Sequence, residues 1–189
     1  MIKLIKYLPI ILKIYFFRLL NRKIRFGHNY KIHYPFLLYL GRKSTLKIGN
    51  NFILSDSDLN PTIASKNSKI ILAQNSELII GNNVAMSSPY LYASTKIEIG
   101  DNCVFGGNVT LVDTDFHSLS YPERRTDSGY INSSPIIIGD DVFVGTKVII
   151  LKGVQIGKCS IIAAGSVVTN NIPDGQIWGG NPARFIKHV

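Results

Sequence analysis

The stretch from Ile138 to Pro173 decides the fold. In groups of six it is IGDDVF, VGTKVI, ILKGVQ, IGKCSI, IAAGSV and VTNNIP. A branched apolar residue opens every group: Ile138, Val144, Ile150, Ile156, Ile162 and Val168. Four residues further on, a second set of small or branched residues repeats: Val142, Val148, Val154, Ser160, Ser166 and Ile172. A helix repeats its apolar positions every 3.6 residues or so and a strand every two, so neither explains this period. A coil with three flat faces does, because stacked coils bury what one coil cannot.

The period predicts an all-β fold, a parallel β-helix over residues 31–173, in which three groups of six make one turn. Before it we expect residues 1–30 to form a basic amphipathic helix and lead-in, and after it residues 174–189 to form a C-terminal tail. The word Ile-Gly followed by Asn or Asp recurs at the corners, where residues that tolerate unusual backbone angles are favoured.

The spacing of these words locates the irregularities. Ile138 and Ile156 are 18 residues apart, which is one turn, and Ile80 and Ile99 are 19 apart. The 32 residues from Ile48 to Ile80 are interpreted as two turns less four. The 39 residues from Ile99 to Ile138 are one turn plus 21, and the surplus falls in the polar, turn-prone stretch at about 113–135. A solenoid that ejects such a loop usually does so at its functional face.

The charge of the chain gathers at one end. The formal net charge is +9, and residues 1–55 hold eleven Lys or Arg without one Asp or Glu. Such a distribution argues against nucleic-acid binding along the whole chain and favours an acidic surface met at one end. Cys103 and Cys159 have no metal or disulfide spacing, so we expect small buried side chains.

Residues 2–26 read IKLIKYLPIILKIYFFRLLNRKIRF. Basic residues interrupt this apolar run too often for a membrane-spanning helix, which needs roughly 20 mostly apolar residues. A basic helix with Ile, Leu, Tyr and Phe on its other side is typical of a segment that lies in a membrane interface. The alternative is that this helix packs on the coils or on a neighbouring subunit.

His117 is the candidate catalytic residue, because it lies where the coil gives way to the loop. A histidine beside carboxylates is held in one tautomer and acts as a general base near neutral pH. Asp115 and Asp113 are both candidates for its partner, and Asn108 is a weaker third. No Ser-His-Asp signature, phosphate-binding loop or Cys/His metal spacing occurs, so no metal is expected.

Three stretches carry a resemblance: IGDNCVFGGNVTLVDTDFH (99–117), the repeats from Pro135 to Pro173, and WGGNPARFIK (178–187). Together they resemble the hexapeptide-repeat acyltransferases, most closely the sugar O-acetyltransferase group that includes galactoside and maltose acetyltransferases. The resemblance implies a left-handed β-helix, a homotrimer, and acetyl-CoA in a groove between neighbouring columns. It makes His117 the base and places an oxyanion-stabilising N–H near Gly145 and Thr146. The coenzyme contacts that it implies are Gly145, Thr146, Ala163, Ala164, Thr169, Arg184 and Lys187.

We therefore expect an acetyl-CoA-dependent O-acetyltransferase that acts on a carbohydrate hydroxyl in capsule or lipopolysaccharide biosynthesis. Residues 1–26 differ from the N-terminal segment of the galactoside and maltose enzymes, which favours a lipid-linked or polysaccharide acceptor over a free sugar. The expected location is cytoplasmic, peripheral to the inner face of the cytoplasmic membrane. The alternatives are N-acetylation of an amino sugar and a non-catalytic β-helix binding protein.

Overall fold

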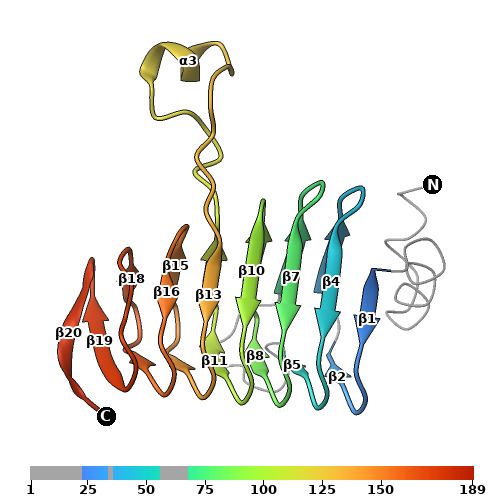
Figure 1. Cartoon of the computed structure of the whole chain (residues 1–189), viewed down its shortest axis with the longest axis vertical. Helices are drawn as coiled ribbons and strands as arrows, with labels where there is room; N and C mark the ends of the chain where they lie inside the picture. Colours follow the sequence, from blue (N-terminus) through green and yellow to red (C-terminus); the bar gives the residue numbers. More distant parts are fainter. Residues whose placement is uncertain (1–22, 34–35, 56–67) are drawn as a thin grey trace.

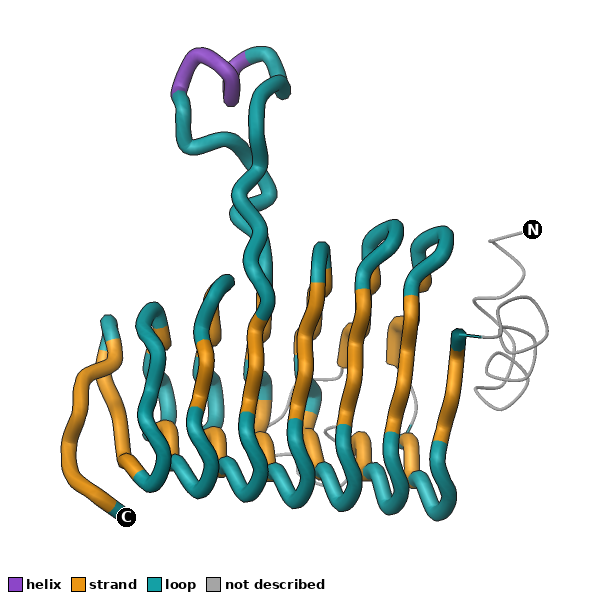
Figure 2. The backbone as a smooth tube through the Cα atoms, in the orientation of Figure 1, coloured by secondary structure: helices purple, strands orange, loops and turns teal. Residues whose placement is uncertain are grey.

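The computed structural model describes residues 23–33, 36–55 and 68–189. Its strands stack into a three-sided prism, with the coils side by side along one axis (Figures 1 and 2). Each coil gives one strand to each of three sheets, and equivalent strands of successive coils pair in parallel. Only the last pair of strands is antiparallel among those described. The predicted parallel β-helix is confirmed.

The strands group by face of the prism. Sheet A contains β1 (Ile24–Phe26), β4 (Thr45–Ile48), β7 (Glu77–Ile80), β10 (Lys96–Ile99), β13 (Ile136–Ile138) and β16 (Gln155–Ile156). Sheet B contains β2 (Lys31–Ile32), β5 (Ile53–Ser55), β8 (Ala85–Ser87), β11 (Val104–Gly107), β14 (Phe143–Val144), β17 (Ile161–Ile162), β19 (Gln176–Gly180) and β20 (Ala183–His188). Sheet C contains β3 (Phe36–Leu40), β6 (Ser68–Leu72), β9 (Tyr90–Ala93), β12 (Thr110–Val112), β15 (Ile149–Leu151) and β18 (Val167–Val168).

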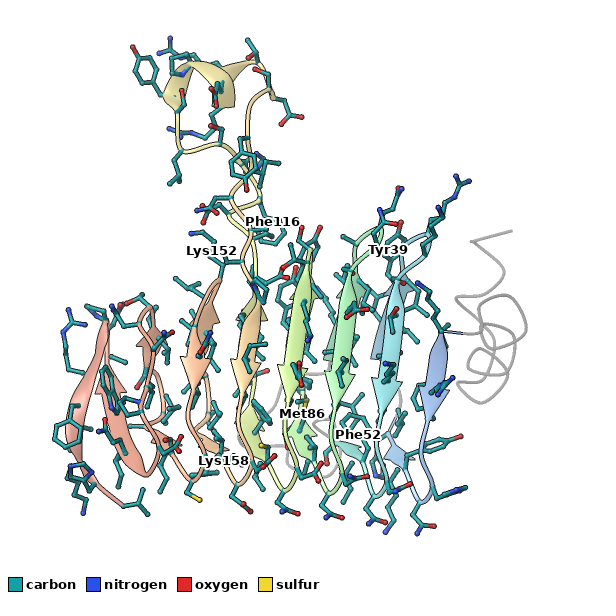
Figure 3. The ribbon with its side chains drawn as sticks, viewed as in Figure 1. Tyr39, Phe52, Met86, Phe116, Lys152 and Lys158 are labelled. Carbon is teal, nitrogen blue, oxygen red and sulfur yellow. The ribbon has the colours of Figure 1, made fainter. Side chains whose placement is uncertain are left out.

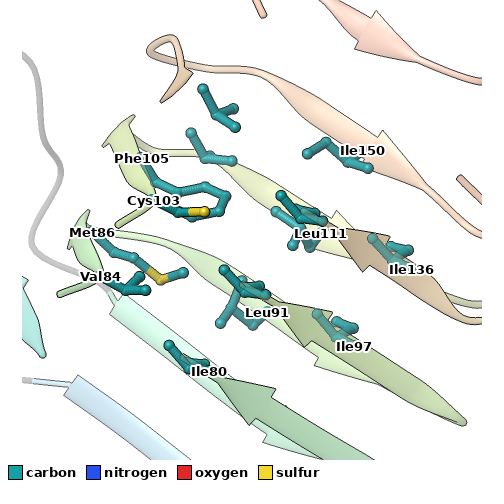
Figure 4. Packing of buried hydrophobic residues seen from close by; sticks show 14 of the residues in the cluster. Ile80, Val84, Met86, Leu91, Ile97, Cys103, Phe105, Leu111, Ile136 and Ile150 are labelled. Atoms are coloured by element: carbon teal, nitrogen blue, oxygen red, sulfur yellow. The ribbon is translucent and has the colours of Figure 1, made fainter. Parts of the chain in front are cut away.

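The core is a set of columns that run the length of the prism. Both sets of sixth-position residues found in the sequence are buried throughout, from Ile138 to Val168 and from Val142 to Ile172. Earlier coils fill the same columns with larger side chains such as Phe52 and, in Figure 4, Met86 and Phe105. Each inward side chain packs on its equivalents one coil above and one below, and this is how short strands that are marginal alone become stable together.

In the sequence motif that recurs at the corners, each residue is favoured for a different structural reason. A Cβ on Gly49 would lie 2.5 Å from the carbonyl oxygen of Gly81 on the next coil, so glycine is required where the coils approach this closely. The next residue, Asn50, donates its backbone N–H to Oδ1 of Asn82 at 2.9 Å. Asn51 then adopts a φ of +56°, which asparagine tolerates better than most residues. The corner motifs therefore allow close backbone contact and hydrogen bonding between each coil and the next.

The structure corrects three boundaries. Ile48 pairs with Ile80, so the 32 residues between them form one coil with a 14-residue surplus, rather than two short turns. Spacing alone cannot separate an insertion from a deletion. The coils begin at β1, before the predicted start at residue 31, because Ile24 is buried and pairs with Leu46. The C-terminal stretch is no loose tail, since β19 continues sheet B and β20 folds back on it.

The predicted N-terminal helix lies outside the described residues, apart from its lead-in. The chain leaves the coil after Val112 and returns at Ile136. The segment between them projects far from the prism on a narrow neck and carries the short helix α3 (Tyr121–Arg125) at its tip (Figures 1 and 2). It emerges at the corner where sheet C gives way to sheet A, and we name this corner of successive coils the C–A edge.

Candidate active site

Backbone pairing builds the neck of the ejected loop. Thr114 and Ser133 form an antiparallel bridge, and their hydroxyl oxygens lie 2.7 Å apart. On either side of the bridge, the N–H of Asp115 donates to the carbonyl of Asn132, and the N–H of Ser134 donates to the carbonyl of Asp113. The outgoing and returning chains are thus held as a two-stranded ribbon, which fixes the direction in which the loop leaves the coil.

Asp113 anchors this neck to the preceding coil. Its side chain is fully buried, and its carboxylate accepts hydrogen bonds from the backbone N–H groups of Ser94, Thr95 and Lys96 at 2.6 to 2.8 Å. The Thr95 hydroxyl donates a fourth hydrogen bond at 2.8 Å. This corrects the prediction of Asp113 as partner of His117, because four donors already surround its carboxylate.

Asp115 and Phe116, the two residues before His117, are held in place by contacts with the coils. Asp115 Oδ1 lies 2.8 Å from Lys152 Nζ, while its other carboxylate oxygen is buried without a hydrogen-bond partner among the described residues. Phe116 has a φ of +62° and packs edge-on against Tyr92, with ring centroids 4.6 Å apart (Figure 3). A bulky residue at positive φ is strained, and it is held there by surrounding contacts. The residue that these contacts present to solvent is His117.

His117 has an exposed imidazole in this chain, with 65% of its side chain accessible. Its Nδ1 lies 4.0 Å from Oδ1 of Asp127, an exposed residue further along the loop. Asp115 binds Lys152 instead, and Asn108 lies at the far edge of sheet C, with a φ of +58° and its N–H donated to Ser87. Asp127 is therefore the acid nearest to His117 among the ion pairs of the described residues.

The tip of the loop is held by its own contacts. The buried Ser118 hydroxyl donates to the carboxylate of Glu123 at 2.5 Å. Arg124 donates from one guanidinium nitrogen to the carbonyls of Ser118 and Leu119, at 2.9 and 3.0 Å. These bonds tie α3 back onto the residues that directly follow His117, so the short helix braces the segment that carries the imidazole.

The candidate coenzyme residues lie on the last coils, and several meet at the corner between sheets B and C. A Cβ on Gly145 would lie 2.6 Å from the backbone N of Ala164. The N–H of Gly165 donates to the carbonyl of Thr146, and that of Ala163 donates to the carbonyl of Trp178. Arg184, on β20, pairs with Gly179 beside them. This corner therefore presents small residues and one exposed guanidinium side by side.

Two of the candidates are not brought to this corner. Thr169 follows β18 at the C–A edge, where its hydroxyl donates to Asn170. Lys187 pairs with Ile177 near the opposite end of the hairpin. The N–H of Gly145 is already donated to Ile162, whereas that of Thr146 has no acceptor in the described part of the chain. Thr146 is therefore the better oxyanion donor of the two.

The sequence reasoning missed Lys152 and Asp127. The register carried a signal for Lys152, because Val112 pairs with Leu151 and the residues that follow them are therefore neighbours. Asp127 lies ten residues from His117 in an irregular loop, where no period applies. Cys103 is buried as predicted, and its pKa is raised to about 11 by desolvation. Cys159 is exposed instead, because it occupies a corner with a φ of +56°.

Within residues 23–33, 36–55 and 68–189, no group of three His, Cys, Asp or Glu side chains converges as a metal site would require. No helix in the same ranges is long and apolar enough to cross a membrane.

Comparison with known proteins agrees with this architecture. Residues 135–170 match the family model for the bacterial transferase hexapeptide (six repeats), and residues 96–112 match the hexapeptide repeat of succinyl-transferase. In sequence, the chain is 32% identical to putative acetyltransferase YJL218W of Saccharomyces cerevisiae over 185 residues, covering 86% of this chain and 89% of that protein. It is 41% identical to galactoside O-acetyltransferase of Escherichia coli over 93 residues, covering 49% of this chain and 44% of that protein. That match spans less than half of the galactoside enzyme.

A shorter stretch of 58 residues is 48% identical to 2,3,4,5-tetrahydropyridine-2,6-dicarboxylate N-acetyltransferase of Staphylococcus aureus, covering 31% of this chain and 24% of that protein.

Solved structures show the same likeness. A hexapeptide-repeat acetyltransferase of Vibrio cholerae, complexed with acetyl-CoA, superposes with a TM-score of 0.58 at 26% identity, over 97% of this chain and 80% of that one. A maltose O-acetyltransferase of Clostridium difficile gives 0.54 at 29% identity, over 81% and 71%. With the repeats, the coils and the full-length likeness to the yeast protein in agreement, the chain belongs to the hexapeptide-repeat transferase family and forms its left-handed parallel β-helix.

Proposed function

We propose that the protein transfers the acetyl group of acetyl-CoA to a hydroxyl of a carbohydrate, with His117 as the general base. The observation that carries this proposal is the position of His117, presented to solvent by a braced neck at the C–A edge. The small-residue corner of the last coils and Arg184 supply a surface for the coenzyme, and relatives named as sugar O-acetyltransferases support the choice of acceptor.

The chemistry follows from these groups. Asp127 lies on the Nδ1 side of His117, so Nε2 is the nitrogen that takes the proton of the acceptor hydroxyl. The hydroxyl oxygen attacks the thioester carbonyl carbon, and a backbone N–H from a neighbouring subunit, for which Thr146 is the candidate, stabilises the oxygen that becomes negative. The carbon–sulfur bond then breaks, and the CoA thiolate receives the proton from the imidazolium. Holding both substrates together supplies much of the acceleration, and a positioned base adds about 10²–10⁴-fold.

The outer faces of the prism support a homotrimer. Sheet B presents an apolar column in register: Ile53, Ala85, Val104, Phe143, Ile161 and Ile177. The corresponding column of sheet C is apolar or aromatic at four of its six positions: Leu37, Lys69, Tyr90, Thr110, Ile149 and Val167. The column of sheet A is apolar at only two of six: Arg25, Lys47, Ile79, Glu98, Ile137 and Gln155. The largely apolar outer columns of sheets B and C give the prism surfaces that suit contacts within a closed ring of three.

The acceptor that we propose is a lipid-linked or surface-polysaccharide sugar, and its modification serves capsule or lipopolysaccharide biosynthesis. The support is the concentration of positive charge in the N-terminal part of the chain, which suits a substrate held at an anionic surface better than a free neutral sugar. On this proposal the enzyme works in the cytoplasm at the inner face of the membrane.

N-acetylation of an amino sugar is the second candidate, favoured by the likeness to the Staphylococcus aureus N-acetyltransferase over 58 residues. An amine needs the same removal of a proton, so the same histidine would serve. The two candidates differ in the bond that is formed, and an ester is cleaved by mild alkali whereas an amide is not.

The test measures thiol release from acetyl-CoA by the purified protein with glycan acceptors, together with mass spectrometry of the product. We expect an alkali-labile acetyl group, and a fall in kcat of about 10²–10⁴-fold in His117→Ala with an unchanged circular dichroism spectrum. The matched control is His188→Ala, which removes a histidine at the C-terminal end of β20. Full activity of His117→Ala would overturn the mechanism, and an alkali-stable product would favour the amine acceptor.

A further inference from the structure

The formal charge divides sharply along the coil axis. Residues 1–67 hold twelve Lys or Arg against two Asp, a net of +10, whereas residues 68–189 hold nine against ten acids, a net of −1. Successive coils lie in order along the prism (Figure 1), and on the first two of them the described residues 23–33 and 36–55 hold six Lys or Arg and no acid. One end of the stack is strongly cationic and the rest is nearly neutral.

Five exposed cations on the first two coils form this surface, which we name the basic end: Arg25, Lys31, Arg42, Lys43 and Lys47. Arg25 on β1 and Lys47 on β4 are direct partners in the register of sheet A, so their Cα atoms lie on strands about 4.8 Å apart. Arg42 and Lys43 lie on the corner between β3 and β4. Like charges placed side by side repel each other, and this arrangement lowers stability unless a counter-charge is supplied.

No ion pair in the described part of the chain joins any of these five cations. The lysine ion pairs seen there join Lys96 to Glu98, Lys152 to Asp115 and Lys158 to Asp140. The acid on the strand next to Lys47 is Glu77, which pairs in register with Thr45 rather than with Lys47. Residues 1–22 add five more Lys or Arg and no acid, so their composition cannot neutralise the basic end.

We propose that the basic end docks the protein onto the anionic phospholipid headgroups of a membrane, with the coil axis upright on the surface. The observations favour a membrane over a soluble polyanion because the cations gather at the end of the stack, instead of along a groove that a chain could follow. In the proposed trimer the three axes are parallel, so three basic ends lie in one plane. The presence of three basic ends in one plane rests on the trimer of the proposed function, whereas membrane binding by a single subunit does not.

The orientation leaves the candidate active site accessible. The loop with His117 follows β12, the fourth strand of sheet C from the basic end, after β3, β6 and β9. Three strand spacings place the neck about 15 Å from the first coil. The loop also projects sideways from the prism, across the coil axis (Figure 1). A protein that stands on its basic end therefore holds His117 clear of the headgroups, where a glycan that extends from a lipid can reach it.

Co-sedimentation of the full-length protein with phosphatidylcholine vesicles, with and without phosphatidylglycerol, tests the proposal. The variant Arg25→Gln/Arg42→Gln/Lys47→Gln removes three cations of the basic end. Its matched control, Lys96→Gln/Arg125→Gln/Lys158→Gln, removes two cations from later coils and one from the ejected loop, and so reaches the same net charge. One basic residue close to an anionic leaflet strengthens binding about fivefold, so we expect the first variant to bind phosphatidylglycerol vesicles about a hundredfold more weakly or worse. The control should stay within a few-fold of the wild type.

An equal loss in both variants, or none in either, overturns the proposal, as does equal binding of the wild type to vesicles without phosphatidylglycerol. Binding to dextran sulfate but not to the vesicles would also overturn it, in favour of a polyanionic glycan. Should the first variant fail to fold by circular dichroism, the salt dependence of the wild type decides, because headgroup binding must fall steeply as salt screens it. Acetyl transfer to a soluble acceptor, measured on the same samples, tests the proposed function separately.

Discussion

Replacing Asp113 distinguishes two roles for this residue: an anchor for the neck of the loop, and a partner that orients His117. As an anchor, its carboxylate accepts three backbone N–H groups and one hydroxyl from Ser94, Thr95 and Lys96. A hydrogen bond to a charged group contributes about 1.5–3 kcal/mol, and part of that loss is recovered where the stranded donors reach water. Because residues 94–96 are half-buried, we expect Asp113→Ala to lower the free energy of unfolding by about 4 kcal/mol. Asp113→Asn keeps one acceptor oxygen but turns an NH₂ toward the donors, so we expect a loss of about 2 kcal/mol.

Urea unfolding, followed by far-UV circular dichroism at fixed protein concentration, measures these losses, and thiol release from acetyl-CoA measures kcat per folded enzyme. The matched control is Asp127→Asn, which removes the exposed acid nearest to His117 and should leave stability unchanged while it lowers kcat. If Asp113→Asn kept full stability and lost activity, Asp113 would orient the catalytic imidazole and the anchoring role assigned here would be refuted.

Three further predictions concern other parts of the prism. Phe143→Glu puts a charge in the apolar column of sheet B, where the wild-type side chain is 46% exposed, and should dissociate the proposed trimer in light scattering, whereas Gln155→Glu on sheet A should not. Arg184→Gln should raise KM for acetyl-CoA about tenfold with kcat little changed, since a charged hydrogen bond to phosphate is worth about 1.5–3 kcal/mol; a fall in kcat alone would contradict its binding role. Burial raises the pKa of the Cys103 thiol to about 11, so at pH 8 a disulfide reagent should titrate one thiol, Cys159, in the native protein and two after denaturation.

The repeats in the sequence predict the interior of this protein well because few side chains fit at each inward position. An inward side chain is fixed by those directly above and below it, so a residue of the right size must recur every sixth position, as it does from Ile138 to Val168. The same logic fails where residues are inserted. The distance from Ile48 to Ile80 fits both two short turns and one long one, and only the pairing of these two residues decides between them.

The surroundings of His117 were harder to predict, because contacts rather than a period place them. Asp113 and Asp115 are two residues apart, yet one carboxylate turns back to the previous coil and the other turns forward to Lys152. Charge and spacing are the same for both. Residues two apart in a regular strand point to the same side, so alternation does not separate them. The chain leaves the coil between them, at the bridge from Thr114 to Ser133, so Asp113 stays beside the previous coil while Asp115 lies on the neck. Asp127, the acid nearest to His117 among the ion pairs of the described residues, comes from further along the loop, and no local pattern encodes that approach.

The C–A edge shows how one fold combines a regular core with irregular side chains at its surface. Stacking fixes the inward positions on every coil, but the corners face water and are free to vary from coil to coil. Along this edge, the corner after β3 carries Arg42 and Lys43, and the corner after β9 offers the backbone donors that hold Asp113. The loop leaves at the corner after β12, and the corner after β15 supplies Lys152. Equivalent corners of successive coils are about one strand spacing apart, so residues far apart in sequence become neighbours at no cost to the core. A binding surface and a reactive loop can therefore be placed on the prism by changes at its corners alone.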